Sequence, residues 1–417
     1  MTVSLLKTNR RLFYGWVILG ALFVMLTTVL GVRSSFGVFF TSIETEFLLS
    51  RAATSSMFSV FMIISAAVAI SGGWLLDRYG PRIVIFLMGV FVALGLVLTS
   101  QTSSVWQLFF TYSLLVALGT GAGFTVVTAT TSRWFVKKRG LALGIGLSGE
   151  GMGTLAIAPL AAYLISSYDW RMTYVVMGLI GGLIICSLAL LLKKSPQEIG
   201  LLPDGESPPP DGIAGRNAGI PVQLLGFSLL ETLRTRSFWF IWLATLLYTA
   251  CHFILLTHIV PHVTDAGISA TTAGVVLALV GGGNFVGRIG MGVASDWIGR
   301  KVSAVICALL QIMVMVWLIW AQDLGTFYLI SVLAGFAFGG LSNSVVAMLG
   351  DTFGVGSLGA IMGAIVVGFS LGAALGPYIG GLIFDVTASY DMAFLIGAAV
   401  TIFALLLIAA VKREVGS

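Results

Sequence analysis

Charged residues are scarce in this sequence of 417 residues, because Asp, Glu, Lys and Arg together make up only 9% of it. A water-soluble domain is therefore excluded, since about a quarter of its residues would be charged. The chain has three cysteines, Cys186, Cys251 and Cys307, which are widely separated within apolar runs. Neither a disulfide framework nor a metal site is expected from them. No nucleophile-and-base arrangement and no phosphate-binding glycine loop is evident, so we expect neither an enzyme nor a cofactor.

Hydrophobic residues take the place of the missing charges and make up 58% of the chain. They form 12 runs of about 20 residues, each long enough to cross the hydrocarbon core of a bilayer as a helix. The sequence therefore predicts an all-α integral membrane protein with 12 transmembrane helices, whose main partner is the lipid bilayer. The runs lie at about 13–40, 51–76, 82–101, 105–132, 140–165, 172–192, 237–263, 269–295, 302–322, 326–349, 357–384 and 392–411.

The basic residues explain the formal net charge of +5 without a nucleic-acid partner. They lie in the termini and in alternate loops, whereas the opposite loops hold little beyond Arg51 and Arg171. This is the positive-inside asymmetry, which predicts cytoplasmic termini and a multi-pass protein of the cell membrane, the inner membrane in a bacterium. The cytoplasmic set comprises Lys7, Arg10, Arg11, Arg78, Arg82, Arg133, Lys137, Lys138, Arg139, Lys193, Lys194, Arg216, Arg234, Arg236, Arg300, Lys301, Lys412 and Arg413.

A polar stretch rich in Pro, Gly and acidic residues divides the chain near its middle. We interpret residues 194–236 as a cytoplasmic linker between an N-terminal half, 1–193, and a C-terminal half, 237–417, each with six helices. Near the end of the linker, Ser228 and Glu231 have the spacing of a capping box, which predicts a short surface helix before the seventh span.

The two halves repeat a loop motif. Gly73-Trp-Leu-Leu-Asp77-Arg78-Tyr-Gly80-Pro-Arg82 ends the second span, and Gly292-Val-Ala-Ser-Asp296-Trp-Ile-Gly299-Arg300-Lys301 ends the eighth, 219 residues later. Glycine allows close helix approach, and the aspartate can accept hydrogen bonds from a neighbouring helix. Two copies at equivalent positions resemble the loop signature of the major facilitator superfamily of secondary transporters. The resemblance implies a cavity between the halves and a gating role for Gly73, Asp77, Arg78, Asp296 and Arg300.

Further stretches resemble the monocarboxylate transporters of that superfamily. Residues 134–153 are similar to the motif that opens their fifth helix, with Gly146 and Ser148 where alanines are usual. Residues 14–16, 335–342, 375–377 and 384–391 are similar to parts of their first, tenth and eleventh helices. The resemblance implies proton-coupled movement of small monocarboxylates such as lactate or pyruvate, with the carboxylate and protons as partners.

Arg288 is the most informative single residue. It precedes Asp296 by eight residues, which places it about 12 Å inside the membrane. A buried guanidinium needs an anion, water or a protein partner there, so Arg288 is either a substrate-binding cation or a structural arginine. In the resembling family an aspartate precedes this arginine by four residues. Here the position is Asn284, which can bind substrate but cannot carry the proton.

Other polar residues within the spans are candidates with two interpretations each. Arg33 is a second anion contact or an arginine near the outer interface. Glu150 lies at nearly the depth of Arg288 and is a proton-coupling carboxylate or part of a tight glycine-rich helix contact. His252 is a proton carrier or a neutral core residue, whereas His258 and His262 are expected in outer-loop structure. Further candidates for lining the cavity are Tyr112, Tyr248, Asn343 and Tyr378.

Two other functions remain open from the sequence. A carboxylate exchanger of the oxalate/formate antiporter type shares the overall pattern, but the eleventh span here lacks the additional lysine that would favour a dicarboxylate. A transporter-like metabolite receptor would need a larger soluble domain than the short linker provides.

Overall fold

The computed structural model describes residues 13–135, 139–205, 227–354 and 358–412. The basic residues Lys7, Arg10, Arg11, Lys137 and Lys138 and most of the linker lie outside this described part. Within it, 12 helical segments are long and apolar enough to cross a membrane, which confirms the predicted all-α protein with 12 spans.

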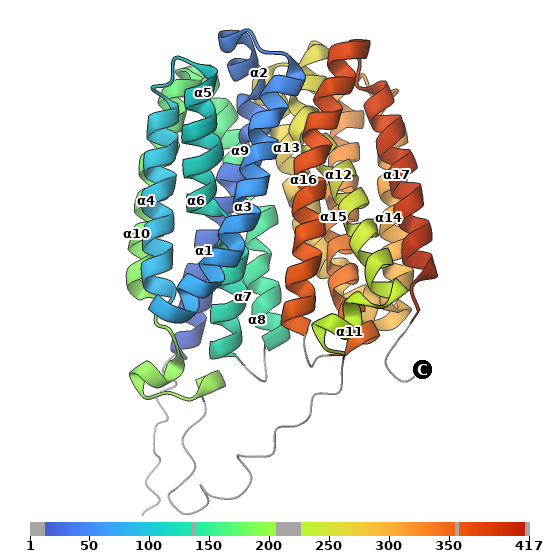
Figure 1. Ribbon diagram of the computed structural model, residues 1–417. Helices are drawn as coiled ribbons and strands as arrows, with labels where there is room; N and C mark the ends of the chain where they lie inside the picture. Colours follow the sequence, from blue (N-terminus) through green and yellow to red (C-terminus); the bar gives the residue numbers. More distant parts are fainter. Residues whose placement is uncertain (1–12, 136–138, 206–226, 355–357, 413–417) are drawn as a thin grey trace, which may run out of the picture.

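The first six spans form one half of the helix bundle (Figure 1). Several of them are interrupted, because the first span breaks at Ser35, the fifth at Ser148, and the fourth contains a π-helical segment. The elements are α1 (Tyr14–Ser34), α2 (Phe36–Phe47), α3 (Arg51–Tyr79), α4 (Pro81–Thr99), α5 (Val105–Leu108), η1 (Phe109–Val116), α6 (Ala117–Thr120), α7 (Gly123–Trp134), α8 (Arg139–Leu147), α9 (Gly149–Ser167) and α10 (Trp170–Leu191).

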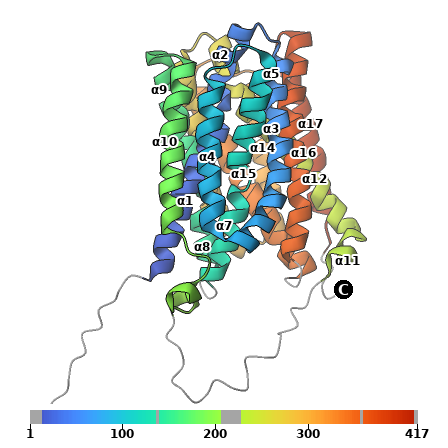
Figure 2. The same cartoon turned by 60° about the vertical axis from the view of Figure 1, so that its left-hand side comes forward.

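The second half follows two short 3-10 turns, η2 (Pro196–Ile199) and η3 (Pro203–Gly205). Its elements are α11 (Leu229–Leu233), α12 (Arg236–Asp265), α13 (Ala270–Ile298), α14 (Arg300–Leu318), α15 (Leu324–Phe353), α16 (Leu358–Thr387) and α17 (Asp391–Ala410). The predicted capping box is confirmed at α11, where the Ser228 and Glu231 side chains each accept a hydrogen bond from the other residue's backbone N–H. Figure 2 shows α11 at the edge of the bundle, where it packs on α12 and α16.

The repeated loops have the same backbone form in both halves. Gly80 ends α3 with a φ of 81°, and Gly299 ends α13 with a φ of 90°. A residue with a side chain rarely adopts such a φ, so glycine allows the next helix to begin at once. Both repeated loops are therefore tight turns.

The seventh span extends further than the sequence suggested. His258 and His262 were expected in a loop, but both lie in α12, which continues past Pro261 to Asp265. A proline is tolerated in a membrane helix when neighbouring helices support the freed backbone groups, and both His258 and Pro261 are buried here.

The two halves contact each other mainly at the end opposite the linker, which we call the outer end. Helix α9 packs on α13, and α3 packs on α16. Among the described residues, every polar contact between the halves lies between the centre and the outer end. Toward the linker end, a Cβ added to Gly144 of α8 or Gly363 of α16 would meet no atom within 4 Å. These two glycines therefore face open space.

Candidate functional site

A small cavity lies at the centre of the bundle, where helices of both halves meet. Its volume is about 10 Å³, enough for about one water molecule in this conformation. Four of the predicted site residues, Arg33, Glu150, His252 and Asn284, line it together with Ser34 and Thr154. The cavity is lined by Leu30, Arg33, Ser34, Glu150, Thr154, His252, Phe253, Leu256, Val280, Gly281, Asn284 and Phe338, and Arg288 reaches it through its contact with Glu150.

The carboxylate of Glu150 connects two arginines. Nη2 of Arg33 donates a hydrogen bond to Oε1 at 2.9 Å, and Nη2 of Arg288 donates to Oε2. Nε of Arg288 also donates to Oδ1 of Asn284 at 3.2 Å, one helical turn earlier in α13. Arg33 and Glu150 are buried, and Arg288 is half-buried. Glu150 and Arg288, which the sequence places at nearly the same depth, form an ion pair, and Arg33 joins it.

Glycines bring Glu150 within reach of both arginines. A Cβ on Gly153 would lie 2.4 Å from the backbone oxygen of Thr27 in α1. A Cβ on Gly151 would lie 2.7 Å from the backbone oxygen of Gly281 in α13. Only glycine therefore allows α9 to approach α1 on one side and α13 on the other. Glu150 lies in the first turn of α9, where the helix dipole also favours a carboxylate.

The opposite wall of the cavity is aromatic. The ring of His252 in α12 stacks on Phe338 of α15, with centroids 3.5 Å apart and an interplanar angle of 4°. The guanidinium carbon of Arg33 lies 5.9 Å from the centroid of Phe253. Within the described part of the chain, no hydrogen bond to the His252 ring is present. The imidazole therefore has hydrogen-bonding capacity that a bound molecule could use.

The other expected cavity residues do not line the cavity in this conformation. Tyr112 lies in the π-helical segment and is buried, and its hydroxyl has no hydrogen-bond partner in the described residues. The ring centroid of Tyr248 is 6.1 Å from that of Phe338, so Tyr248 lies behind the aromatic wall. Asn343 instead contacts Gly292, whose added Cβ would lie 3.1 Å from its amide nitrogen. Tyr378 is exposed on α16 and is not among the residues that line this cavity.

Sequence reasoning missed several lining residues. Ser34 follows Arg33 directly, and Thr154 lies one turn after Glu150 on α9, so helical spacing could have indicated both. Thr154 Oγ1 donates to Ser34 Oγ at 2.9 Å and joins the two helices beside the ion pairs. The apolar lining residues, among them Phe338, carry no comparable sequence signal.

The predicted gating residues lie at the linker end. Asp77 accepts a hydrogen bond from Arg133 at 2.5 Å, and Asp296 pairs with Arg300. The Arg78 guanidinium carbon lies 5.4 Å from the Trp74 ring, and a Cβ on Gly73 would lie 3.4 Å from Thr125. All these contacts remain within one half. Among the residues that the structure describes, the repeated loops therefore make no ion pair between the halves in this conformation.

Comparisons with known proteins agree with this architecture. Residues 17–324 and 260–416 match the family described as the Major Facilitator Superfamily. Monocarboxylate transporter 13 of Bos taurus is 28% identical over 399 residues, covering 93% of this chain and 86% of that protein. The oxalate:formate antiporter of Oxalobacter formigenes is 27% identical over 285 residues, covering 68% of this chain and 64% of that protein.

A solved structure has the same fold. It is that of a bacterial homologue of the human lysosomal transporter Spinster in an inward-facing and unoccupied conformation. Its TM-score is 0.72 at 18% identity, and the match covers 95% of this chain and 96% of that one. With these family matches, the chain belongs to the Major Facilitator Superfamily: it is a multi-pass membrane transporter, not an enzyme, and is related to the monocarboxylate transporters and the oxalate:formate antiporter.

Proposed function

We propose that this transporter moves small monocarboxylates of the lactate or pyruvate type together with a proton. The observation that carries the proposal is the position of the Glu150 carboxylate, which accepts hydrogen bonds from Arg33 of α1 and Arg288 of α13. Two guanidiniums around one carboxylate make a binding geometry that suits any carboxylate, because charge-assisted pairs of this kind are strong. The carboxylate of a substrate would occupy the place that Glu150 occupies here.

Competition for the arginines couples the anion to a proton. When a substrate carboxylate binds Arg33 and Arg288, Glu150 loses both partners while it remains buried. An ionised carboxylate without a partner is costly in a buried site, so Glu150 takes up a proton. Asn284 cannot titrate, but its amide oxygen accepts from Nε of Arg288 and orients the guanidinium. One anion and one proton then enter the site together.

The same exchange of partners permits alternating access. Glu150 belongs to the first half and Arg288 to the second, so their ion pair holds the halves together at the centre. Substrate and proton together replace that pair, and the loaded site has the same total charge as the empty one. The halves can then rock around the site, and the loaded site carries no more charge across the membrane than the empty site does.

Carboxylate exchange is the second candidate, supported by the similarity to the oxalate:formate antiporter. An exchanger needs an anion in the site for each rocking step and no proton. The described part of α16 carries no lysine or arginine that would receive a second carboxylate, which favours a monocarboxylate.

Transport into proteoliposomes separates the two candidates. Labelled lactate, pyruvate, acetate and oxalate are offered with a pH gradient or a membrane potential imposed separately, and protein-free liposomes measure passive entry of the undissociated acids. Proton symport predicts accumulation of lactate or pyruvate driven by the pH gradient alone. Uptake that requires an internal counter-substrate and ignores the pH gradient would favour exchange and contradict symport.

A further inference from the structure

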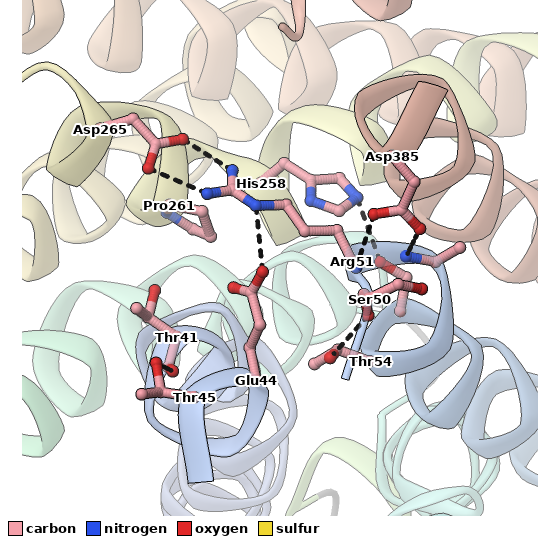
Figure 3. A network of polar contacts seen from close by, with 12 residues as sticks. Thr41, Glu44, Thr45, Ser50, Arg51, Thr54, His258, Pro261, Asp265 and Asp385 are labelled. Atoms are coloured by element: carbon pink, nitrogen blue, oxygen red, sulfur yellow. Dashed lines mark hydrogen bonds and ion pairs between the residues drawn. The ribbon is translucent and has the colours of Figure 1, made fainter. Parts of the chain in front are cut away.

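A second buried arginine, Arg51, connects the two halves at the outer end (Figure 3). It is the first residue of α3, and its side chain is only 10% exposed. Its two terminal nitrogens donate to the two carboxylate oxygens of Asp265 in α12, at 2.7 and 2.9 Å. This bidentate ion pair fixes the relative angle of α3 and α12 as well as the distance between them.

Arg51 also contacts the last two helices of the second half. Nη1 donates to the hydroxyl of Tyr390 at 2.7 Å, and the guanidinium carbon lies 3.7 Å from the ring centroid of Phe384. One side chain of the first half therefore contacts α12, α16 and the residue that precedes α17. A single charge thus joins three segments of the opposite half.

The backbone of α3 is held by the second half as well. The N–H groups of Arg51 and Ala52 donate to the two oxygens of Asp385 at 2.8 and 2.9 Å. The first N–H groups of a helix have no partner within the helix, and a carboxylate there is stabilised by the helix dipole. Asp385 of α16 therefore caps a helix that belongs to the other half.

The contact continues inward along one face of α3. Ser55 and Ser59 follow Arg51 at intervals of four residues, so all three share that face. Ser55 Oγ lies 3.3 Å from Nε2 of His258, and Ser59 Oγ donates to the backbone oxygen of Ala374. Gly381 allows this close approach, because an added Cβ would lie 2.6 Å from the backbone oxygen of Arg51.

Glu44 differs from the other partners of Arg51, because it belongs to the same half. Its Oε1 accepts from Nε of Arg51 at 3.3 Å. If the halves separated at the outer end, Arg51 would leave Asp265, Asp385 and Tyr390 but would keep Glu44. The arginine would then still have a counter-ion, without which an open state would be strongly disfavoured.

We propose that these residues form the outer gate of the transporter: Arg51 and the start of α3 lock onto Asp265, Asp385 and Tyr390 when the outer end is closed, and Glu44 stabilises Arg51 when it is open. The gate is separate from the central site and acts whatever the substrate is. It determines how often the site becomes accessible from the outer side.

Distances between spin labels test the gate without any substrate, so its failure is distinguishable from failure of the proposed function. Cys186 is replaced by Ser, because it is partly exposed, while Cys251 and Cys307 are buried. One label pair at Trp106→Cys and Trp320→Cys reports on the outer end, and another at Tyr79→Cys and Trp297→Cys reports on the linker end; all four positions are exposed. Double electron–electron resonance on the labelled protein in nanodiscs then gives the distance distribution of each label pair, and from it the populations of the two conformations.

Arg51→Gln, Asp265→Asn and Asp385→Asn should each increase the ratio of outward-open to inward-open protein, by at least about tenfold for Arg51→Gln. The outer label pair should gain a longer distance and the inner pair a shorter one. The matched control is Arg171→Gln, which removes an ion pair with Glu46 at the same end but within one half. It should leave both distances unchanged.

Adding Glu44→Gln to Asp385→Asn should reverse part of the shift, because the open state loses its counter-ion. A merely structural Glu44 would not change populations in that direction. Folded variants are identified by monodisperse elution from a size-exclusion column. If Arg51→Gln does not fold, Asp265→Asn and Asp385→Asn test the proposal in its place. Unchanged distances in the folded variants, or an equal shift in Arg171→Gln, would overturn the proposal.

Discussion

Glu150 and Arg288 form an ion pair across the interface between the two halves, although 138 residues separate them in the sequence. This pair is part of the candidate binding site and also one of the contacts that hold the halves together. A molecule that displaces Glu150 from Arg288 therefore changes both the charge balance of the cavity and the connection between the halves. Under the proposed function, substrate binding and the movement of the halves therefore depend on the same residue pair.

Replacing Arg288 should affect substrate binding most. Arg288→Lys keeps the charge but loses the planar fork that pairs with Glu150 and Asn284, so lactate affinity should fall about tenfold. Arg288→Ala should nearly abolish transport, because a hydrogen bond to a charged group contributes about 1.5–3 kcal/mol. Calorimetric binding and proteoliposome uptake measure both variants. Wild-type binding and transport of lactate by a folded Arg288→Ala protein would refute the anion-site assignment.

Arg33 provides a second test of the same geometry. If the Glu150 carboxylate marks the position of the substrate, both arginines contact the substrate, and Arg33→Gln should also weaken binding by about tenfold. An arginine that only stabilises the fold would instead lower the melting temperature and leave the affinity of the remaining folded protein intact. Binding and thermal unfolding of the same preparation distinguish these results.

The repeated loops at the linker end should control the rate of transport. Asp77 pairs with Arg133 and Asp296 with Arg300 in this conformation, each within one half. Asp77→Asn and Asp296→Asn should change the balance between the two conformations and reduce turnover by up to about fivefold, because exposed ion pairs contribute at most about 1 kcal/mol. Affinity should stay the same. A parallel collapse of affinity would indicate misfolding or direct contact with the substrate.

The fold could be predicted from the sequence to a large extent, because a helix must carry about 20 apolar residues to cross the bilayer. The breaks at Ser35 and Ser148 could not, since the composition stays apolar on both sides of each break. His258 and His262 were expected in a loop because they flank Pro261, whereas packing supports the helix there.

The sequence predicted how deep the site residues lie in the membrane, but not toward which neighbours their side chains point. Counting residues from the loops placed Glu150 and Arg288 at one level, and they are in contact. Hydropathy does not give the rotation of a helix about its axis, so it could not show that Tyr378 is absent from the lining of this cavity. The partners of Arg51 come from segments far apart in the chain, and no local pattern connects them.

Asp323 gives a prediction about pH. It caps α15 at the outer end and accepts hydrogen bonds from the hydroxyl and the N–H of Thr326, at 2.5 and 3.0 Å, which lower the pKa of its carboxyl. A lowered pKa means that the stabilisation is complete above the unfolded-state pKa of about 3.9 and is lost as the pH falls through the folded-state value. Asp323→Ala should therefore lower the melting temperature at pH 7 and differ less from wild type in acid. Asp323→Asn keeps an acceptor but does not titrate, so its difference from Asp323→Ala should not depend on pH; a constant difference between wild type and Asp323→Ala would contradict the prediction.

Glu150→Gln tests where the proton is carried. The glutamine oxygen can still accept a hydrogen bond from one arginine, so the cavity keeps its shape, but the side chain cannot take up a proton. The variant should retain lactate exchange between equal internal and external pools, since that process needs only the anion site. It should lose accumulation driven by a pH gradient, which for one anion and one proton reaches about tenfold per pH unit.

The alternative is that Glu150 only joins α9 to its neighbours in a glycine-rich contact, and the two interpretations predict different results. A structural carboxylate would lower the melting temperature and the exchange rate together when replaced, and would leave accumulation by the remaining folded protein coupled to pH. Glu46→Gln is the matched control, because Glu46 is also paired with an arginine, Arg171, but far from the cavity and within one half. That variant should accumulate lactate like wild type. If folded Glu150→Gln protein did the same, Glu150 would not carry the proton, and His252, whose ring lines the cavity, or the substrate itself would have to carry it.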